Sequence, residues 1–149
     1  MDFEGNVVWE KASLVEIPAH SSDDYFSENI YEFLYRKNSR ELLFSTKLIE
    51  NGNMLSENIF FFRPFKELTV PSPKVEYTMT KTDSGFDIEV STDKLAKNVY
   101  LQTQEDAGFF SDNYFDLLPG ETKTVCLETN LSENELNEIL TVRTLDDAF

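Results

Sequence analysis

The chain of 149 residues is poor in the residues that build covalent or metal-based structure: it holds one cysteine and one histidine. Cys126 alone cannot form a disulfide within the chain, and Cys126 and His20 are too few for a zinc cluster. The strand-like run 122–129 around Cys126 predicts a packed small side chain. A Cys126–His20 catalytic dyad is the open alternative, but nothing in the sequence supports their proximity.

Positive charge is scarce, with 13 basic residues against 28 acidic ones and a net charge of −15. The imbalance is steeper from Lys74 onward, where 16 acidic residues face 6 basic ones. Such a field repels phosphate backbones and excludes nucleic acid as an expected partner. The acidic residues predict a solvated surface; a calcium site is the sharper alternative, but the EF-hand loop pattern is missing. We therefore expect no metal or cofactor.

Long apolar runs are also missing. No stretch approaches the roughly 20 apolar residues that a membrane helix needs, and the first residues lack the basic and apolar regions of a signal peptide. We expect no membrane partner. Hydrophobic residues nevertheless make up 40% of the chain and aromatic residues 13%, which is enough apolar mass for a packed core.

Apolar and polar residues alternate with a period of two through much of the second half. The pattern covers 75–80, 86–91, 99–102 and 124–128, and turn signals at 83–85, 93–94 and 119–120 separate these runs. Such alternation is typical of half-buried antiparallel strands. It predicts an all-β, immunoglobulin-like antiparallel sandwich. Ser132 and Glu135 form a capping-box pattern that predicts one short helical turn, and 139–144 is predicted to be the closing strand.

The first half is also predicted to be β, with less regular patterning. Residues 41–49 and 54–63 flank Asn51-Gly52, a strong hairpin signal. The spacing of Ile30, Phe33 and Leu34 predicts a short helix within 29–35. Segment 6–17 is predicted to be extended, with these core candidates: Val7, Trp9, Leu14 and Ile17. Trp9 is also a possible platform for a sugar, although its setting between apolar residues favours core packing.

Two prolines, Pro71 and Pro73, bracket Ser72 and favour a stiff, extended connector. This pattern predicts three parts: a sandwich over residues 1–70, a linker over 71–73 and a second sandwich over 74–149.

The run 107–121 is the most distinctive stretch of the chain. It ends on Pro119-Gly120, a type II turn signal. Its aromatic and polar residues have two interpretations: they plug one end of the sandwich, with the polar ones holding a turn, or they contact a ligand or another domain. The candidate sugar or interdomain contact residues are Phe109, Phe110, Asp112, Asn113, Tyr114 and Phe115.

The second half resembles the C-terminal immunoglobulin-like domain of glycoside hydrolase family 2 β-mannosidases. The similar stretches are LAKNVYL at 95–101, GFFSDNYFDLLPGE at 108–121 and VRTLD at 142–146. The first half resembles the preceding sandwich of the same enzymes through GNVVWEK at 5–11, IPAHSS at 17–22 and LSENIFFF at 55–62, which leads to Pro64.

This resemblance implies a non-catalytic accessory and structural module of a β-mannosidase, whose parent enzyme hydrolyses terminal β-D-mannose residues. In the family the two catalytic glutamates lie on a (β/α)₈ barrel. No barrel pattern occurs here, so no catalytic residue is assigned. Carboxylate pairs such as Glu105/Asp106 and Asp146/Asp147 would point to opposite faces of a strand and are interpreted as solvated charge. The implied partners are the catalytic barrel and other domains of the parent.

The alternative function is an autonomous carbohydrate-binding module for mannan-type sugars, with a manno-oligosaccharide as ligand. The resemblance also implies strands that precede segment 7–11, so the first sandwich is expected to be truncated. Missing strands leave an open edge and an uncovered apolar face, and we predict self-association through the N-terminal half. The lack of disulfide potential fits a bacterial parent, periplasmic or cytoplasmic.

Overall fold

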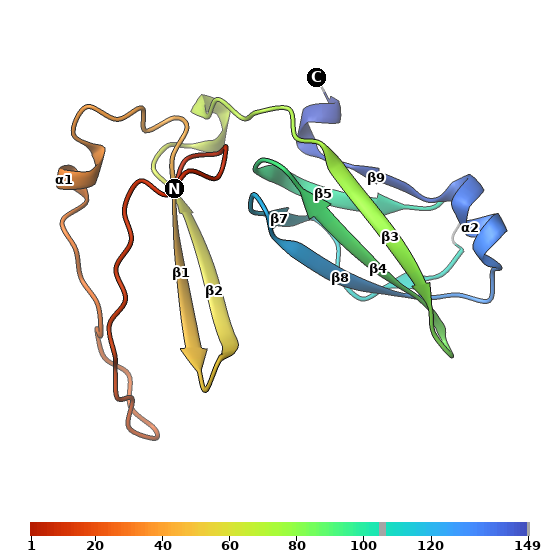
Figure 1. The fold of residues 1–149 in the computed structure, drawn as a ribbon, viewed down its shortest axis with the longest axis horizontal. Helices are drawn as coiled ribbons and strands as arrows, with labels where there is room; N and C mark the ends of the chain where they lie inside the picture. The colour runs from red at the N-terminus through yellow and green to blue at the C-terminus, as the bar shows by residue number, and fades with distance from the viewer. Residues whose placement is uncertain (105–106, 149) are drawn as a thin grey trace. The chain divides into compact units, whose positions relative to one another are not determined.

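A computed structural model describes residues 1–104 and 107–148 (Figure 1). The contacts between residues divide the chain into two compact units. Unit 1 comprises Met1–Asp2 and Asn6–Leu68, and unit 2 comprises Phe3–Gly5 and the chain from Thr69 onward. Among the described residues, no helix is long and apolar enough to cross a membrane.

Unit 2 is an antiparallel β structure with two sheets, as the alternating pattern predicts. The first sheet has the order β3 (Val75–Lys81), β4 (Gly85–Thr92), β8 (Thr122–Glu128) and β6 (Phe109–Phe110). The second has the order β7 (Phe115–Leu117), β5 (Ala96–Gln102) and β9 (Thr141–Arg143). Every strand pair is antiparallel. The predicted all-β fold class is therefore confirmed.

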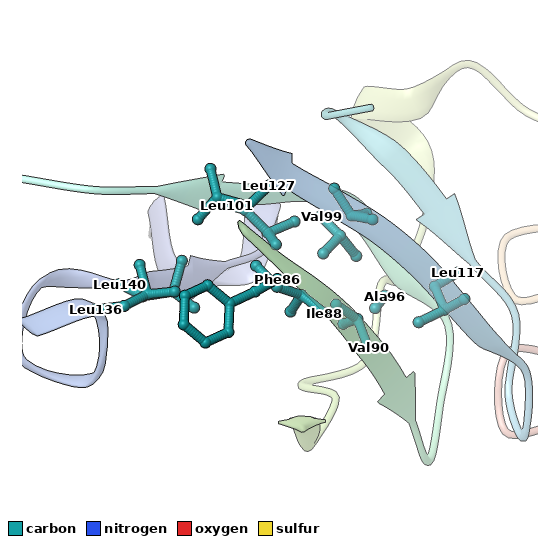
Figure 2. Packing of buried hydrophobic residues seen from close by; sticks show 11 residues of the cluster. Phe86, Ile88, Val90, Ala96, Val99, Leu101, Leu117, Leu127, Leu136 and Leu140 are labelled. Atoms are coloured by element: carbon teal, nitrogen blue, oxygen red, sulfur yellow. The ribbon is translucent and has the colours of Figure 1, made fainter. Parts of the chain in front are cut away.

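The core of unit 2 lies between these sheets, and Figure 2 shows side chains of both sheets meeting there. On the first sheet, Ile88 of β4 pairs with Val125 of β8, and both are fully buried. The second sheet contributes Val99 and Leu101 of β5, which are also buried. Because successive strand residues point to opposite faces, the same alternation leaves a polar outer face on the first sheet.

A capped helix closes this core. α2 (Glu133–Ile139) has Ser132 as its N-cap. The Ser132 side chain accepts the backbone N–H of Glu135, and the Glu135 carboxylate accepts the backbone N–H of Ser132 at 2.8 Å. The predicted capping box is confirmed, but the helix is longer than the predicted single turn, because Leu136 and Leu140 are both buried in the core. Ile139 is therefore helical, and the closing strand β9 is shorter than predicted.

Two turns behave as their sequences predict. Gly120 has a φ of 76°, and the Glu121 N–H donates to the Leu118 carbonyl at 3.0 Å, which is the type II turn predicted for Pro119-Gly120. In unit 1, β1 (Leu43–Glu50) and β2 (Asn53–Phe61) form an antiparallel hairpin. Asn51 and Gly52 both have positive φ, the geometry that favours Asn-Gly in such hairpins.

The short helix of unit 1 is also present where the spacing predicts it. α1 (Ile30–Leu34) is capped at its N-terminus by Asn29, whose side chain accepts the backbone N–H of Tyr31 at 3.1 Å. A 3₁₀ turn, η1 (Phe65–Glu67), follows the hairpin.

Segment 6–17 is not core in this structure. It forms no strand, and Val7, Leu14 and Ile17 are exposed, so their predicted burial is wrong. Trp9 is half-buried and stacks on Phe44, with ring centroids 6.2 Å apart. The physical reason is the two-stranded sheet of unit 1, which offers the segment no second layer within the described residues.

A second correction concerns the paired carboxylates. Asp146 and Asp147 lie in a 3₁₀ turn, η2 (Leu145–Ala148), so the strand argument made for them is wrong. Asp147 accepts the backbone N–H of Thr144 at 2.6 Å and thereby holds the turn. The pair Glu105/Asp106 lies outside the described residues.

Candidate functional site

The aromatic residues of the run 107–121 divide into an inward and an outward set. Phe110 lies opposite Leu127 and Phe115 lies opposite Val99, so both pack against the core. Phe109 and Tyr114 are 70% and 65% exposed. The inward set is half-buried, so the second set is the more accessible from outside the sandwich.

Asp112 is engaged in holding this run. Its carboxylate accepts the backbone N–H of Asn113 at 2.7 Å and pairs with the Lys123 ammonium. The hydrogen bond from Lys123 lowers the pKa of Asp112 below its ordinary value. The same ammonium lies 4.5 Å from the centre of the Phe115 ring, a cation–π contact. One lysine thus joins the loop to the inward-facing aromatic.

Asn113 ties the run to strand β5. Its Oδ1 accepts the backbone N–H of Leu101 and its Nδ2 donates to the Leu101 carbonyl, each at 2.8 Å. Its Oδ1 also lies within 3.3 Å of the Tyr114 N–H. These are the side-chain-to-backbone bonds expected of a structural turn, and they leave little of this amide for a ligand.

Tyr114 follows Asn113 and has an exposed side chain. Its φ of 60° is left-handed, an uncommon conformation for a bulky residue. Its ring stacks on Tyr100, with centroids 4.5 Å apart and an interplanar angle of 18°. A hydrogen bond between the two side chains raises the pKa of Tyr114.

Tyr100 was not among the predicted contact residues. It lies between the buried Val99 and Leu101 on β5, so the period of two places it on the outer face of the second sheet. Directly opposite on β9 is Arg143, which is exposed. The alternation alone could have flagged Tyr100 as an outward aromatic, whereas its pairing with Arg143 links positions 43 residues apart.

Cys126 is exposed, so its predicted packing is wrong. Its neighbours Val125 and Leu127 occupy the core face of β8, which turns Cys126 to the outer face beside Asp87. A hydrogen bond with Asp87 raises the pKa of the thiol. This disfavours the thiolate and argues against a nucleophile. His20, the other residue of the alternative dyad, is an exposed loop residue of unit 1.

No group of three or more His, Cys, Asp and Glu side chains is placed to hold a metal ion among the described residues.

In unit 1, Trp9 lines a small apolar pocket of about 30 Å³, together with Met1, Leu43 and Phe62. Trp9 is half-buried and its ring stacks on Phe44. It therefore packs within unit 1 more than it offers an exposed ring to a sugar.

Comparison with protein families gives two adjoining matches. A family described as an Ig-fold domain of mannosidases matches residues 70–148. A second family, the mannosidase Ig/CBM-like domain, matches residues 1–67. Together the two matches cover nearly the whole chain.

Among solved structures, the β-D-mannosidase from Dictyoglomus thermophilum is similar in fold, with a TM-score of 0.79 and 23% sequence identity. The similarity covers 97% of this chain but 17% of that enzyme, so the chain spans about a sixth of its length. No curated protein matches the chain.

Proposed function

Because the chain belongs to the mannosidase Ig-fold domain family, we propose that it is a non-catalytic accessory and structural module of a β-mannosidase. The parent enzyme would hydrolyse terminal β-D-mannose residues. Residues 1–70 and 74–149 would be the two domains of the module, with 71–73 as the connector.

The observation that carries this proposal is the order of the two matches. An Ig/CBM-like mannosidase domain followed by a mannosidase Ig-fold domain accounts for 1–67 and 70–148. In the similar Dictyoglomus enzyme the matched part is 17% of the chain. The remainder of such an enzyme would supply the catalytic barrel and the other domains as partners.

The polar contacts of unit 2 support a scaffolding role. The Asp116 carboxylate pairs with Lys97 at 2.7 Å and accepts the Asn98 N–H at 3.1 Å. Asp112 pairs with Lys123. Each of these carboxylates pairs with a neighbouring lysine and accepts a backbone N–H, so each stabilises the local fold of unit 2.

The hairpin of unit 1 supports a role beside a partner. Large apolar side chains are exposed on it: Ile49, Met54, Leu55 and Phe60. A two-stranded hairpin is marginally stable alone, and exposed apolar strands invite pairing. Within a parent enzyme this surface would be covered by neighbouring structure; in the isolated chain we expect self-association through it.

Two assays test the proposal. The chain alone should release no p-nitrophenol from p-nitrophenyl β-D-mannopyranoside, and enzyme-dependent turnover would overturn a non-catalytic role. A Dictyoglomus enzyme lacking the matching segment should lose thermal stability. A chimaera that carries this chain in its place should regain part of that stability, and a chimaera no more stable than the deletion would contradict the proposal.

A further inference from the structure

The exposed side chain of Tyr114 stands on a backbone with a left-handed conformation. A bulky residue at φ 60° is a strained choice, since glycine or asparagine adopts this conformation more readily. Strain of this kind persists where surrounding structure imposes it, and it is concentrated at functional sites. The neighbouring Asn113 is held in place by its two bonds to Leu101. The aromatic ring that follows Asn113 remains 65% exposed.

Arg143 supplies a polar group beside Tyr100, the inner ring of this pair. It faces Tyr100 across β5 and β9, and directly opposed residues of antiparallel strands share one face. Unit 2 has six basic side chains. Four of them form ion pairs: Lys74, Lys94, Lys97 and Lys123. Lys81 lies over the Phe86 ring. Arg143 alone has neither kind of contact within the described part of the chain.

We propose that the stacked Tyr100–Tyr114 pair, together with Arg143, is a binding platform for a pyranose ring of a neutral oligosaccharide. Sugar sites combine an apolar face with a few placed polar groups, and here the exposed ring provides the face. The guanidinium provides donors for sugar hydroxyls. The platform is additional to the scaffold role and uses residues that the scaffold does not occupy.

Charge selects a neutral ligand over an anion. From Lys74 onward the chain has 16 acidic and 6 basic residues, so an anionic ligand would meet a repulsive field despite Arg143. An uncharged sugar is not repelled by this field.

The size of the exposed apolar surface argues against a protein partner at this position. Among the described residues of unit 2, Phe109 and Tyr114 are the exposed large apolar side chains. They belong to opposite sheets, because Phe109 lies on β6 and Tyr114 stacks on β5. A stable protein interface buries about 800 Å² on each partner around an apolar centre. A single sugar ring matches a lone stacked pair better.

The test is an amide NMR titration of the full chain with β-1,4-mannobiose. We expect saturable shifts at residues 100–101, 113–114 and 142–143, with a dissociation constant on the order of 1 mM. Tyr114→Asn should weaken binding by about tenfold or more, because it removes the ring while asparagine tolerates positive φ. Arg143→Gln should weaken it by about threefold to tenfold.

The matched control is Tyr31→Ala, which removes an exposed tyrosine from α1 and should leave the titration unchanged. Unshifted amides of Ile88 and Val125 in each variant show that the core of unit 2 is intact. The proposal is overturned if no saturable shifts appear, or if Tyr114→Asn binds as the parent chain does. Neither result bears on the hydrolysis assay or the chimaera, so failure of the platform is separable from failure of the scaffold role.

Discussion

The side chain of Asn113 bonds to the backbone of Leu101 twice, accepting its N–H and donating to its carbonyl, each at 2.8 Å. Strand β7 pairs with β5 at Ala96 and Val99 but not at Leu101. The amide of Asn113 therefore takes the place of a neighbouring strand at the point where the ladder stops. Because Leu101 is 1% exposed, water is a poor substitute for these bonds.

Replacing Asn113 with alanine should destabilise the chain by about 2–4 kcal/mol, since it leaves a backbone donor and an acceptor of a core strand unsatisfied. Asn113→Asp keeps an acceptor but loses the donor, and should also destabilise. Urea unfolding followed by circular dichroism measures both. The control is Asn130→Ala at an exposed loop position, which should stay within about 0.5 kcal/mol. Equal effects of Asn113→Ala and Asn130→Ala would contradict this account of the turn.

The pair Asp112–Lys123 predicts a dependence of stability on acid. Lys123 lowers the pKa of Asp112 below its ordinary value of 3.8, so the folded state binds this proton less readily than the unfolded state. The stabilisation is therefore present above the unfolded pKa and is lost as the pH falls through the folded pKa. Because the side chain is 47% exposed, we expect less than about 1 kcal/mol.

Asp112→Asn tests this sign. At neutral pH the variant should be slightly less stable than the parent chain in urea. The difference in stability should shrink as the pH falls through the folded-state pKa of Asp112, below which both side chains are neutral. If the difference in free energy of unfolding between the parent chain and Asp112→Asn widens in acid, the carboxylate does not stabilise the folded state. High salt should also narrow the gap at neutral pH, because the pair is partly exposed.

Gly85 is required by the close approach of β4 and β8. A Cβ there would lie 2.0 Å from the Leu127 carbonyl oxygen and 2.8 Å from the Thr129 nitrogen. Both are backbone atoms, so Gly85→Ala must displace the strand, and we expect a loss of about 3 kcal/mol or more. Gly120→Ala is the control, because nothing lies within 4 Å of its Cβ position; its cost should be the strain of positive φ, about 1–2 kcal/mol. Thermal unfolding that ranks the two variants in reverse order would refute the clash.

The sequence was most predictive where local signals and burial agree. Ile88 and Val125 alternate with polar neighbours on strands that each have one solvent-exposed face, so the period of two identifies both residues as core residues. Asn51-Gly52 predicts its own turn because both residues tolerate positive φ. The small size of Cys126 predicts packing, but the same alternation places its side chain on the outer face of β8, where it is exposed.

Relations between distant residues could not be predicted in this way. Segment 6–17 is apolar at several positions, yet burial depends on a second layer that the segment does not itself encode. The opposition of Tyr100 and Arg143 depends on the register of strands β5 and β9. Between these strands the chain forms β6, β7, β8 and α2. Asn113 was expected to hold a turn, but its target on β5 could not be read from local sequence.

The last prediction concerns how α2 is stabilised. Leu136 is 0% exposed and packs in the core, whereas Ser132 caps the helix at the surface. Leu136→Ala leaves a cavity and should destabilise by about 3 kcal/mol, while Ser132→Ala loses the cap and should cost about 1 kcal/mol. Asn137→Ala, on the exposed side of the same helix, should be neutral or slightly stabilising because alanine is the better helix former. Urea unfolding of the three variants gives the ranking. If Ser132→Ala costs more than Leu136→Ala, the helix depends on its own cap more than on the sandwich beneath it, and its role in closing the core is refuted.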